Sequence, residues 1–337
     1  MKCFHLFLLV SPFLFFSCKQ KQDATISFYY WKTNFTLSAN ETQTLYDNAV
    51  KKLYIRYFDV DKEPGQLQAK PISPVVINDS LNNYNIVPVV YIKKRVFENT
   101  DSNSLPALAK NIFLLITQIN QSKQITNTEV QFDCDWTEST KEMYFSFLRT
   151  YRNISKQNLS ATIRLHQVKY YQRTGVPPVD RGVLMYYNMG EINSSNTNSV
   201  YDKTIASKYN PSLSHYPLVL DVALPIFAWG QQIRDGRVVG LLNKINESHF
   251  ANDSNFISLD KNRLQLKHAC FKAGYYFQER DEVKLESITE EALLDMAGEI
   301  NKYLKNKPHT VIFYDLDSIN IVRYEKDVYK KVLDNLN

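Results

Sequence analysis

The chain alternates short apolar runs with longer segments of helical spacing, and this alternation limits the folds it can adopt. Eight runs have the length of β-strands: 26–31, 53–58, 85–92, 129–135, 160–165, 182–187, 217–224 and 310–314. Helical spacing occurs over 39–52, 104–121, 138–156, 202–208 and 288–304. Strands separated by helices are typical of an α/β protein with a parallel sheet. Eight such strands predict a (β/α)8 or TIM barrel.

Residues 226–286 interrupt this alternation. They contain short strand-like runs and polar turns such as 234–237, Arg-Asp-Gly-Arg, without a strong helical pattern. The segment lies between the seventh and eighth predicted strands. We therefore predict a small insertion in a barrel that extends over 25–337, rather than a separate domain.

The first residues have the pattern of a secretory signal. An apolar run over 3–16 is too short to span a bilayer comfortably, and it ends at Cys18, where polar residues follow at once. The pattern resembles the lipobox of bacterial lipoproteins, with Phe15 in place of the usual leucine. We predict a signal peptide over 1–17, lipidation of Cys18, a polar tether over 18–24, and anchoring to a bacterial membrane of the cell envelope, with the outer membrane favoured. The alternative is an ordinary cleaved signal with an incidental cysteine.

The composition is that of a globular protein with a sizeable core, since 44% of residues are hydrophobic and 13% are aromatic. The formal net charge of +5 is too mild and too evenly spread to indicate binding to nucleic acid. With nine glycines, no phosphate-binding loop and no histidine pair, the sequence predicts neither a cofactor nor a metal site.

Two cysteines, Cys134 and Cys270, remain after the signal and Cys18 are set aside. They could form a disulfide in an oxidising compartment. However, Cys134 lies between two aspartates of a predicted strand, so its side chain should point outward beneath a helix as a small apolar group. Pairing of the two cysteines is therefore not favoured.

Asp133 and Asp135 lie at the end of the fourth predicted strand. Side chains two residues apart in a strand share a face and lie roughly 7 Å apart. Burying carboxylates there is costly without partners. One interpretation has one aspartate capping the next helix and the other in a buried hydrogen-bonded network. The other has both facing a substrate site at the carboxyl end of a barrel strand.

Four segments, in order along the chain, resemble motifs of family 18 glycoside hydrolases. The segment 133–136, Asp-Cys-Asp-Trp, resembles the end of the signature Asp-x-x-Asp-x-Asp-x-Glu. The segment 185–188, Met-Tyr-Tyr-Asn, resembles Met-x-Tyr-Asp, and 224–230 resembles the Pro-Phe-Tyr-Gly segment after the seventh strand. The segment 311–317 is similar to the eighth-strand run that ends in a substrate-stacking tryptophan. The whole chain also resembles a group of uncharacterised bacterial lipoproteins with glycosidase-like barrels.

The sequence departs from this family at the signature residues that carry out the reaction. In the family, the signature Glu protonates the leaving oxygen and the neighbouring Asp orients the acetamido group of the substrate. Placing Asp135 on that Asp puts Thr137 at the Glu, and a threonine hydroxyl cannot usefully donate a proton at neutral pH. Glu138, one residue later, is either a substitute acid or a helix-start residue that interacts with the helix dipole.

The resemblance implies a cleft at the carboxyl ends of the strands. The candidate catalytic residues are Asp135 and Glu138. The candidate substrate-binding residues are Trp31, Asp133, Tyr187, Asn188, Trp229 and Tyr314. Asn188 stands where the family has Asp, and Tyr314 where it has Trp. Aromatic residues at strand ends, among them also Trp136, either stack on sugar rings or fill the top of the barrel.

Several other polar residues allow two interpretations. Asp59 and Asp61, after the second predicted strand, are either turn residues or acids of the site. Asp221 interrupts an apolar strand, and a buried aspartate there would need a partner such as Arg56 or Arg164. His166 is either a polar strand end or a base.

Three functions stay open. The first is an active glycosidase that uses Asp135 with an acid from Glu138 or Asp59. The second is a glycan-binding protein that kept the cleft and lost the acid, and the third is a non-enzymatic scaffold or assembly lipoprotein of the cell envelope. Thr137 weakens the first possibility, while the Asp133 and Asp135 pair weakens the third. The expected partners are carbohydrate and, through the lipid, a membrane; the sequence identifies no protein partner.

Overall fold

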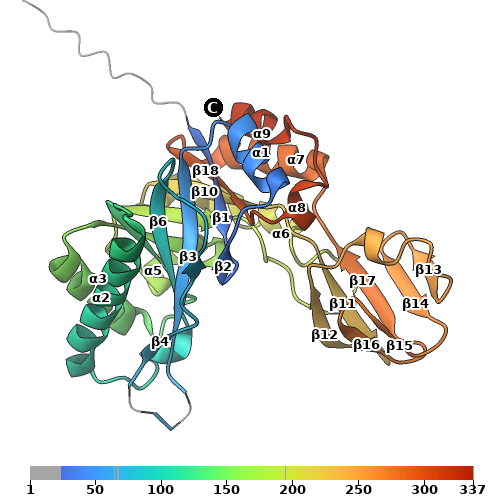
Figure 1. Ribbon diagram of the computed structural model, residues 1–337, viewed down its shortest axis with the longest axis horizontal. Helices are drawn as coiled ribbons and strands as arrows, with labels where there is room; N and C mark the ends of the chain where they lie inside the picture. Colours follow the sequence, from blue (N-terminus) through green and yellow to red (C-terminus); the bar gives the residue numbers. More distant parts are fainter. Residues whose placement is uncertain (1–23, 64, 67, 194, 337) are drawn as a thin grey trace, which may run out of the picture.

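The computed structural model describes residues 24–336 apart from 64, 67 and 194 (Figure 1). The predicted signal peptide and Cys18 lie outside the described residues. Within the described part of the chain, no helix is both long enough and apolar enough to cross a membrane.

Eight parallel strands form a closed barrel (Figure 1). They are β1 (Thr25–Tyr30), β3 (Lys52–Asp61), β6 (Asn85–Ile92), β7 (Glu129–Asp133), β8 (Asn158–Arg164), β9 (Arg181–Met185), β10 (Leu220–Pro225) and β18 (Thr310–Tyr314). Neighbours in the chain are neighbours in the barrel, and β1 closes the ring by pairing with both β3 and β18. The predicted (β/α)8 barrel is confirmed.

Helices cover the outside of the barrel (Figure 1). They are α1 (Ala39–Asp47), α2 (Leu105–Lys123), α3 (Lys141–Ser155), α4 (Leu165–Lys169), α5 (Tyr171–Thr174), α6 (Lys203–Ser207), α7 (Glu290–Tyr303), α8 (Ser318–Ile321) and α9 (Val328–Leu336). The 3-10 helix η3 (Asn210–His215) packs beside α4, α6 and α7. In α3, Tyr144, Phe147, Leu148 and Tyr151 recur at helical spacing and are buried. Two of these rings contact Phe132 of β7, with centroids 5.2 and 4.8 Å away.

Two boundaries differ from the prediction in ways that affect the site. Strand β3 continues to Asp61 because its end pairs with the antiparallel strand β4 (Lys70–Ile72), so Asp59 and Asp61 belong to a strand and not to a turn. Helix α3 begins at Lys141, because the backbone N–H of Thr137 donates to Thr140 Oγ1 in a turn that precedes it. Glu138 therefore lies in this turn, outside the first turn of the helix.

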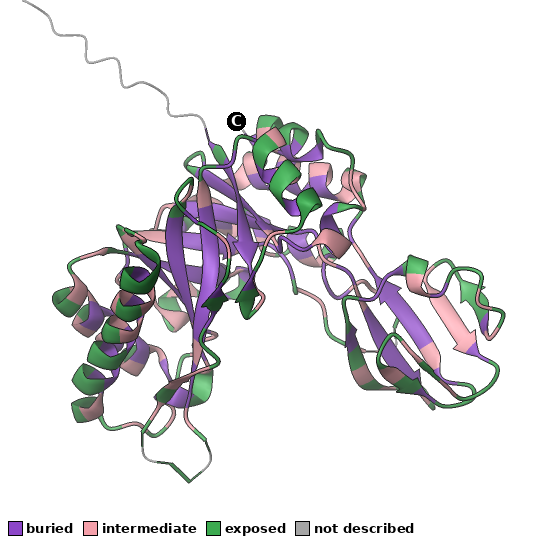
Figure 2. Ribbon diagram, viewed as in Figure 1, coloured by how far each residue is buried: buried purple, intermediate pink, exposed green. Residues whose placement is uncertain are grey.

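The chain between β10 and β18 forms a second sheet that projects to one side of the barrel (Figure 1). In spatial order it contains β12 (Arg237–Asn243), β11 (Trp229–Arg234), β17 (Glu282–Glu286), β14 (Arg263–Leu266) and β13 (Phe256–Asp260), with a hairpin of β15 (Cys270–Lys272) and β16 (Tyr275–Phe277). Buried residues such as Leu242, Phe250 and Val283 give it a core of its own. Figure 2 shows that burial is concentrated in the barrel strands and in the central strands of this sheet.

Candidate functional site

Asp133 and Asp135 face the interior of the barrel near its mouth. Thr162 Oγ1 donates a hydrogen bond of 2.6 Å to Asp133 Oδ1, and Arg164 Nη2 donates one of 2.7 Å to Asp135 Oδ2. Thr162 and Arg164 are also two residues apart, and β8 runs in register beside β7. Strand β7 ends at Asp133, two residues before the predicted end, so the contacts with Thr162 and Arg164, and not strand periodicity, place Asp135 beside Asp133 at the mouth.

The two carboxyl groups have different surroundings. Burial and the nearby charge of Asp135 together raise the pKa of Asp133 to about 6, against the hydrogen bond from Thr162, which lowers it. The side chain of Asp135 is 38% exposed and forms an ion pair with Arg164. Asp133 is therefore a carboxyl group that binds and releases a proton near pH 6.

This raised pKa predicts a pH-dependent effect of Asp133→Asn. The folded state holds a proton that the unfolded state releases between about pH 4 and pH 6, so the free energy of unfolding of the wild type falls as the pH rises through that interval. Asp133→Asn has no carboxyl group at this position, so its free energy of unfolding does not fall in this way. We expect it to match the wild type near pH 4 and to be more stable by up to about 3 kcal/mol at pH 7.

The measurement is urea unfolding at a series of pH values. Asp334→Asn, at an exposed position of α9, is the control and should show the same pH dependence as the wild type. A difference between Asp133→Asn and wild type that stays constant from pH 4 to pH 7 would contradict the assignment.

A cluster of aromatic rings around Tyr314 forms one side of the mouth. The ring of Tyr187 stacks on that of Tyr314, with centroids 5.4 Å apart and planes at 22°. Trp31 and Phe227 contact Tyr314 edge-on at 5.5 and 5.8 Å, and Trp229 contacts Phe227 at 5.5 Å. Tyr314 ends β18 and the other rings follow β1, β9 and β10, so the structure brings together four predicted binding residues from distant parts of the chain.

Two members of the cluster were not among the predicted substrate-binding residues. Tyr29 contacts both Trp31 and Tyr314, and its hydroxyl donates to Gln131 Oε1 at 2.6 Å. Phe227 lies between Tyr314 and Trp229. The sequence contained a signal for both, because Phe227 belongs to the segment 224–230 that resembles a family motif, and Tyr29 belongs to the aromatic run 28–31 at the end of the first predicted strand.

The indole of Trp229 is held by a buried ion pair of the inserted sheet. Its Nε1–H donates to Glu286 Oε2 at 2.8 Å, and Glu286 pairs with Lys284 at 2.6 Å. Both charged side chains are completely buried, and Lys284 Nζ also donates to the carbonyl of Thr197 at 2.7 Å. Lys284 and its two partners therefore connect the inserted sheet to the loop after β9 and fix a ring of the mouth.

Glu138 and Trp136 lie apart from this cluster, whereas Asn188 borders it next to Tyr187. The Glu138 side chain is 56% exposed and pairs with Arg173 at 2.9 Å. Asn188 is exposed, has φ of 52°, and lines a small cavity of about 70 Å³ with Arg164, His166 and Tyr187. Trp136 is buried, stacks on Tyr144 and donates to the carbonyl of Thr174, so of the two interpretations of the strand-end aromatics it fits packing and not sugar stacking.

The remaining acids have structural partners. Asp59 pairs with Arg56 at 2.7 Å. Asp61 binds Lys93 and Arg95, each at 2.6 Å, and these hydrogen bonds hold the pKa of its carboxyl well below the usual range.

Cys134 is buried, and it and Cys270 are free thiols. In the described residues, no group of three or more histidine, cysteine or acidic side chains is arranged to hold a metal ion.

The predicted partner of Asp221 was wrong. Asp221 is buried, but it pairs with Arg181 at 2.7 Å and accepts hydrogen bonds from the backbone N–H groups of His309 and Thr310. These residues lie at the amino ends of β9, β10 and β18, whereas Arg164 ends β8 at the mouth. A partner from the opposite end of the barrel was therefore out of reach.

Solved structures with the same architecture are known, although no protein-family model and no curated protein matches the chain. The spore cortex-lytic enzyme SleL of Bacillus cereus has a TM-score of 0.55 at 11% identity, covering 93% of this chain and 74% of its own. A GH18 chitinase of Cycas revoluta, solved as a mutant with (GlcNAc)4, has a TM-score of 0.52 at 10% identity, covering 93% and 100%. A class V chitinase of Nicotiana tobaccum, solved as a mutant with NAG4, has a TM-score of 0.51 at 8% identity, covering 94% and 99%.

These likenesses define the class of fold. The chain is a (β/α)8 barrel with the architecture of family 18 chitinases and related glycoside hydrolases. At identities near 10%, the comparison shows the fold alone, so the function has to be argued from the residues at the mouth.

Proposed function

We propose that this protein binds a glycan at the mouth of the barrel and hydrolyses it slowly or not at all. The observation that carries the proposal is the aromatic cluster around Tyr314, to which four strand ends contribute rings. Flat aromatic surfaces bury the apolar C–H faces of sugar rings, and polar groups beside them fix the orientation of the hydroxyls. Trp31, Trp229 and Tyr314 are each half-buried, which leaves part of each side chain open to a ligand.

The polar side of the same mouth supports this proposal. Asp135 and Arg164 are each more than one-third exposed in their ion pair, so both can also bind ligand hydroxyl or amide groups. Two solved structures with this fold are chitinases in complex with four-residue N-acetylglucosamine oligomers. N-acetylated oligosaccharides are therefore the first ligands to test.

The weakness of hydrolysis rests on the position of the acids. Thr137 Oγ1 lies 2.9 Å from Ser139 Oγ and offers only a hydroxyl where the resemblance places a carboxylic acid. Glu138 is paired with Arg173 at the surface, and Asp59 is paired with Arg56. Asp133 can be protonated near neutral pH, but it is buried and engaged with Thr162, so a glycosidic oxygen has poor access to it.

Trp229→Ala should weaken glycan binding. Removing an aromatic surface that stacks on a sugar is expected to lower affinity about three- to tenfold, in line with about 0.5–1.5 kcal/mol per aromatic contact. A glycan array identifies the ligand, and isothermal calorimetry measures the affinities. Tyr46→Ala, on the outer face of α1 and 80% exposed, is the control and should leave the affinity unchanged. An array without hits would exclude glycan binding and favour the scaffold alternative.

The proposal includes a lipid anchor at Cys18 in the cell envelope, which rests on the sequence of the first 18 residues. Fatty-acid labelling of the expressed protein should be lost in Cys18→Ala. Cys134→Ala is the matched control and should keep the label, because that cysteine is buried in the barrel. Equal labelling of the wild type and Cys18→Ala would rule out this attachment site.

A further inference from the structure

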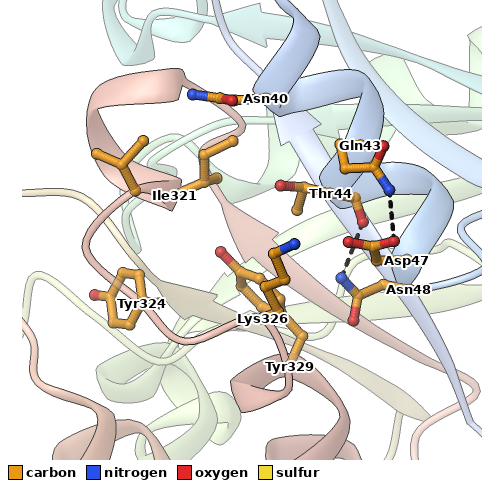
Figure 3. Close-up of a pocket in the computed structure, with 10 residues that line it drawn as sticks. Asn40, Gln43, Thr44, Asp47, Asn48, Ile321, Tyr324, Lys326 and Tyr329 are labelled. Atoms are coloured by element: carbon orange, nitrogen blue, oxygen red, sulfur yellow. Dashed lines mark hydrogen bonds between the residues drawn. The ribbon is translucent and has the colours of Figure 1, made fainter.

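A polar pocket lies outside the barrel, between α1 and the segment that contains α8 and the start of α9 (Figure 3). Its volume is about 300 Å³, which is at the lower end of the range for small-molecule sites. The ring of Tyr329 forms part of its wall and packs against Phe28 of β1 and Phe313 of β18, with centroids 5.2 and 4.8 Å away. The pocket is therefore built on the rigid barrel wall.

Two buried polar atoms at this pocket lack partners within the part of the chain that the structure describes. Asn48 is 6% exposed, and its Nδ2 donates to the carbonyl of Thr44 at 2.9 Å, but nothing donates to its Oδ1. Tyr329 is 2% exposed, and its hydroxyl has no partner. Buried polar groups are normally hydrogen-bonded, and leaving them unpaired costs free energy. Neither atom has appreciable accessible surface, so a ligand hydroxyl would give either one a partner only where the side chains lining the pocket move to admit it.

The two walls of the pocket differ in chemistry. One wall is largely apolar and is formed by Ile321, Val322 and Tyr324. The other carries the amides of Asn40 and Gln43 and the carboxylate of Asp47, to which Gln43 donates at 2.7 Å. Figure 3 shows the Lys326 side chain extending between these walls.

We propose that this pocket binds a small sugar of one or two rings, at a site separate from the barrel mouth. A sugar has apolar C–H groups for the first wall and hydroxyls that both donate and accept for the second. The opposite charges of Asp47 and Lys326 favour such a neutral ligand over an anion. The inference does not depend on glycan binding at the mouth, because the two sites share no residue.

Tyr329→Phe tests the site by removing only the hydroxyl group of Tyr329. Without sugar, the variant should be as stable as the wild type or more stable, because the lost hydroxyl has no partner among the described residues. With N-acetylglucosamine as the probe, its affinity for the pocket should fall about three- to tenfold, the value of one hydrogen bond. Tyr46→Phe, on the same α1 wall but outside the pocket, is the matched control and should change neither quantity.

The place of binding is settled by a crystal of the Trp229→Ala variant soaked in the same sugar, since this variant weakens the proposed site at the mouth. Density for a sugar ring within hydrogen-bond distance of Asn48 Oδ1 and the Tyr329 hydroxyl supports the proposal. Water alone in the pocket, or sugar found only at the mouth, overturns it. A marked loss of stability in sugar-free Tyr329→Phe would also overturn it, because the hydroxyl would then already be satisfied by water.

Discussion

Thr137→Glu is expected to raise glycan hydrolysis by about 10²–10⁴-fold over the wild type, which is the usual contribution of a positioned general acid. Thr137 is half-buried in the turn between β7 and α3, two residues after Asp135. We expect the longer side chain of a glutamate at this position to reach a leaving oxygen bound beside Asp135 and to protonate it. The measurement is product release from N-acetylglucosamine oligomers, followed by chromatography over many hours.

Thr137→Gln is the matched control, because glutamine has the size of glutamate but no acidic proton. It should show the activity of the wild type while binding the oligomers as tightly as Thr137→Glu does. Equal hydrolysis by the two variants would show that the added length, and not the acid, is responsible. If Thr137→Glu binds oligomers but does not cleave them, the ion pair between Asp135 and Arg164 holds the aspartate away from the acid, and Thr137→Glu combined with Arg164→Ala should then be active.

Lys284→Met should destabilise the protein by about 3–5 kcal/mol, the usual effect of leaving one member of a buried ion pair without its partner. Lys284 and Glu286 are both completely buried, and the substitution leaves the Glu286 carboxylate without a cation. The pKa of Glu286, now held below its ordinary value by hydrogen bonds from Lys284, Ser199 and Trp229, should rise. Urea unfolding measures the stability, and tryptophan fluorescence reports on the indole of Trp229.

Two variants show whether burial is the cause. Lys203→Met breaks the surface ion pair with Asp295, and it should cost no more than about 1 kcal/mol. Lys284→Met combined with Glu286→Leu removes both charges and should recover much of the lost stability, because no unpaired charge remains buried. A Lys284→Met protein as stable as Lys203→Met would mean that water reaches Glu286 in solution.

The partners of the site residues could not be predicted from the sequence. Asp135 pairs with Arg164, 29 positions later, and Trp229 donates to Glu286, 57 positions later. Such contacts depend on strand register and on the path of the inserted sheet. The residues that neighbour each site residue in the sequence specify neither of these. The same reason explains Asp221, whose partner was sought at the wrong end of the barrel.

The positions of Trp136 and Trp229 also could not be predicted from the sequence. Each follows a barrel strand, and each resembled a residue of the mouth. Trp136 turns outward beneath α3 and stacks on Tyr144, while Trp229 lies beside Phe227 at the mouth. The choice depends on which neighbouring side chains leave space for the ring.

The sequence alone determined the features that depend on local spacing. Strand-length apolar runs alternating with helical patterns predict a parallel sheet covered by helices, and eight such strands favour the (β/α)8 barrel. The period of two predicted that Asp133 and Asp135 share a face, and the sequence has Thr137 where the family resemblance places the acid. The tertiary structure alone decided the pairing of Asp135 with Arg164, the raised pKa of Asp133, and the convergence of aromatic rings on Tyr314. Those properties come from distances between residues far apart in the chain, which are set only when the barrel closes.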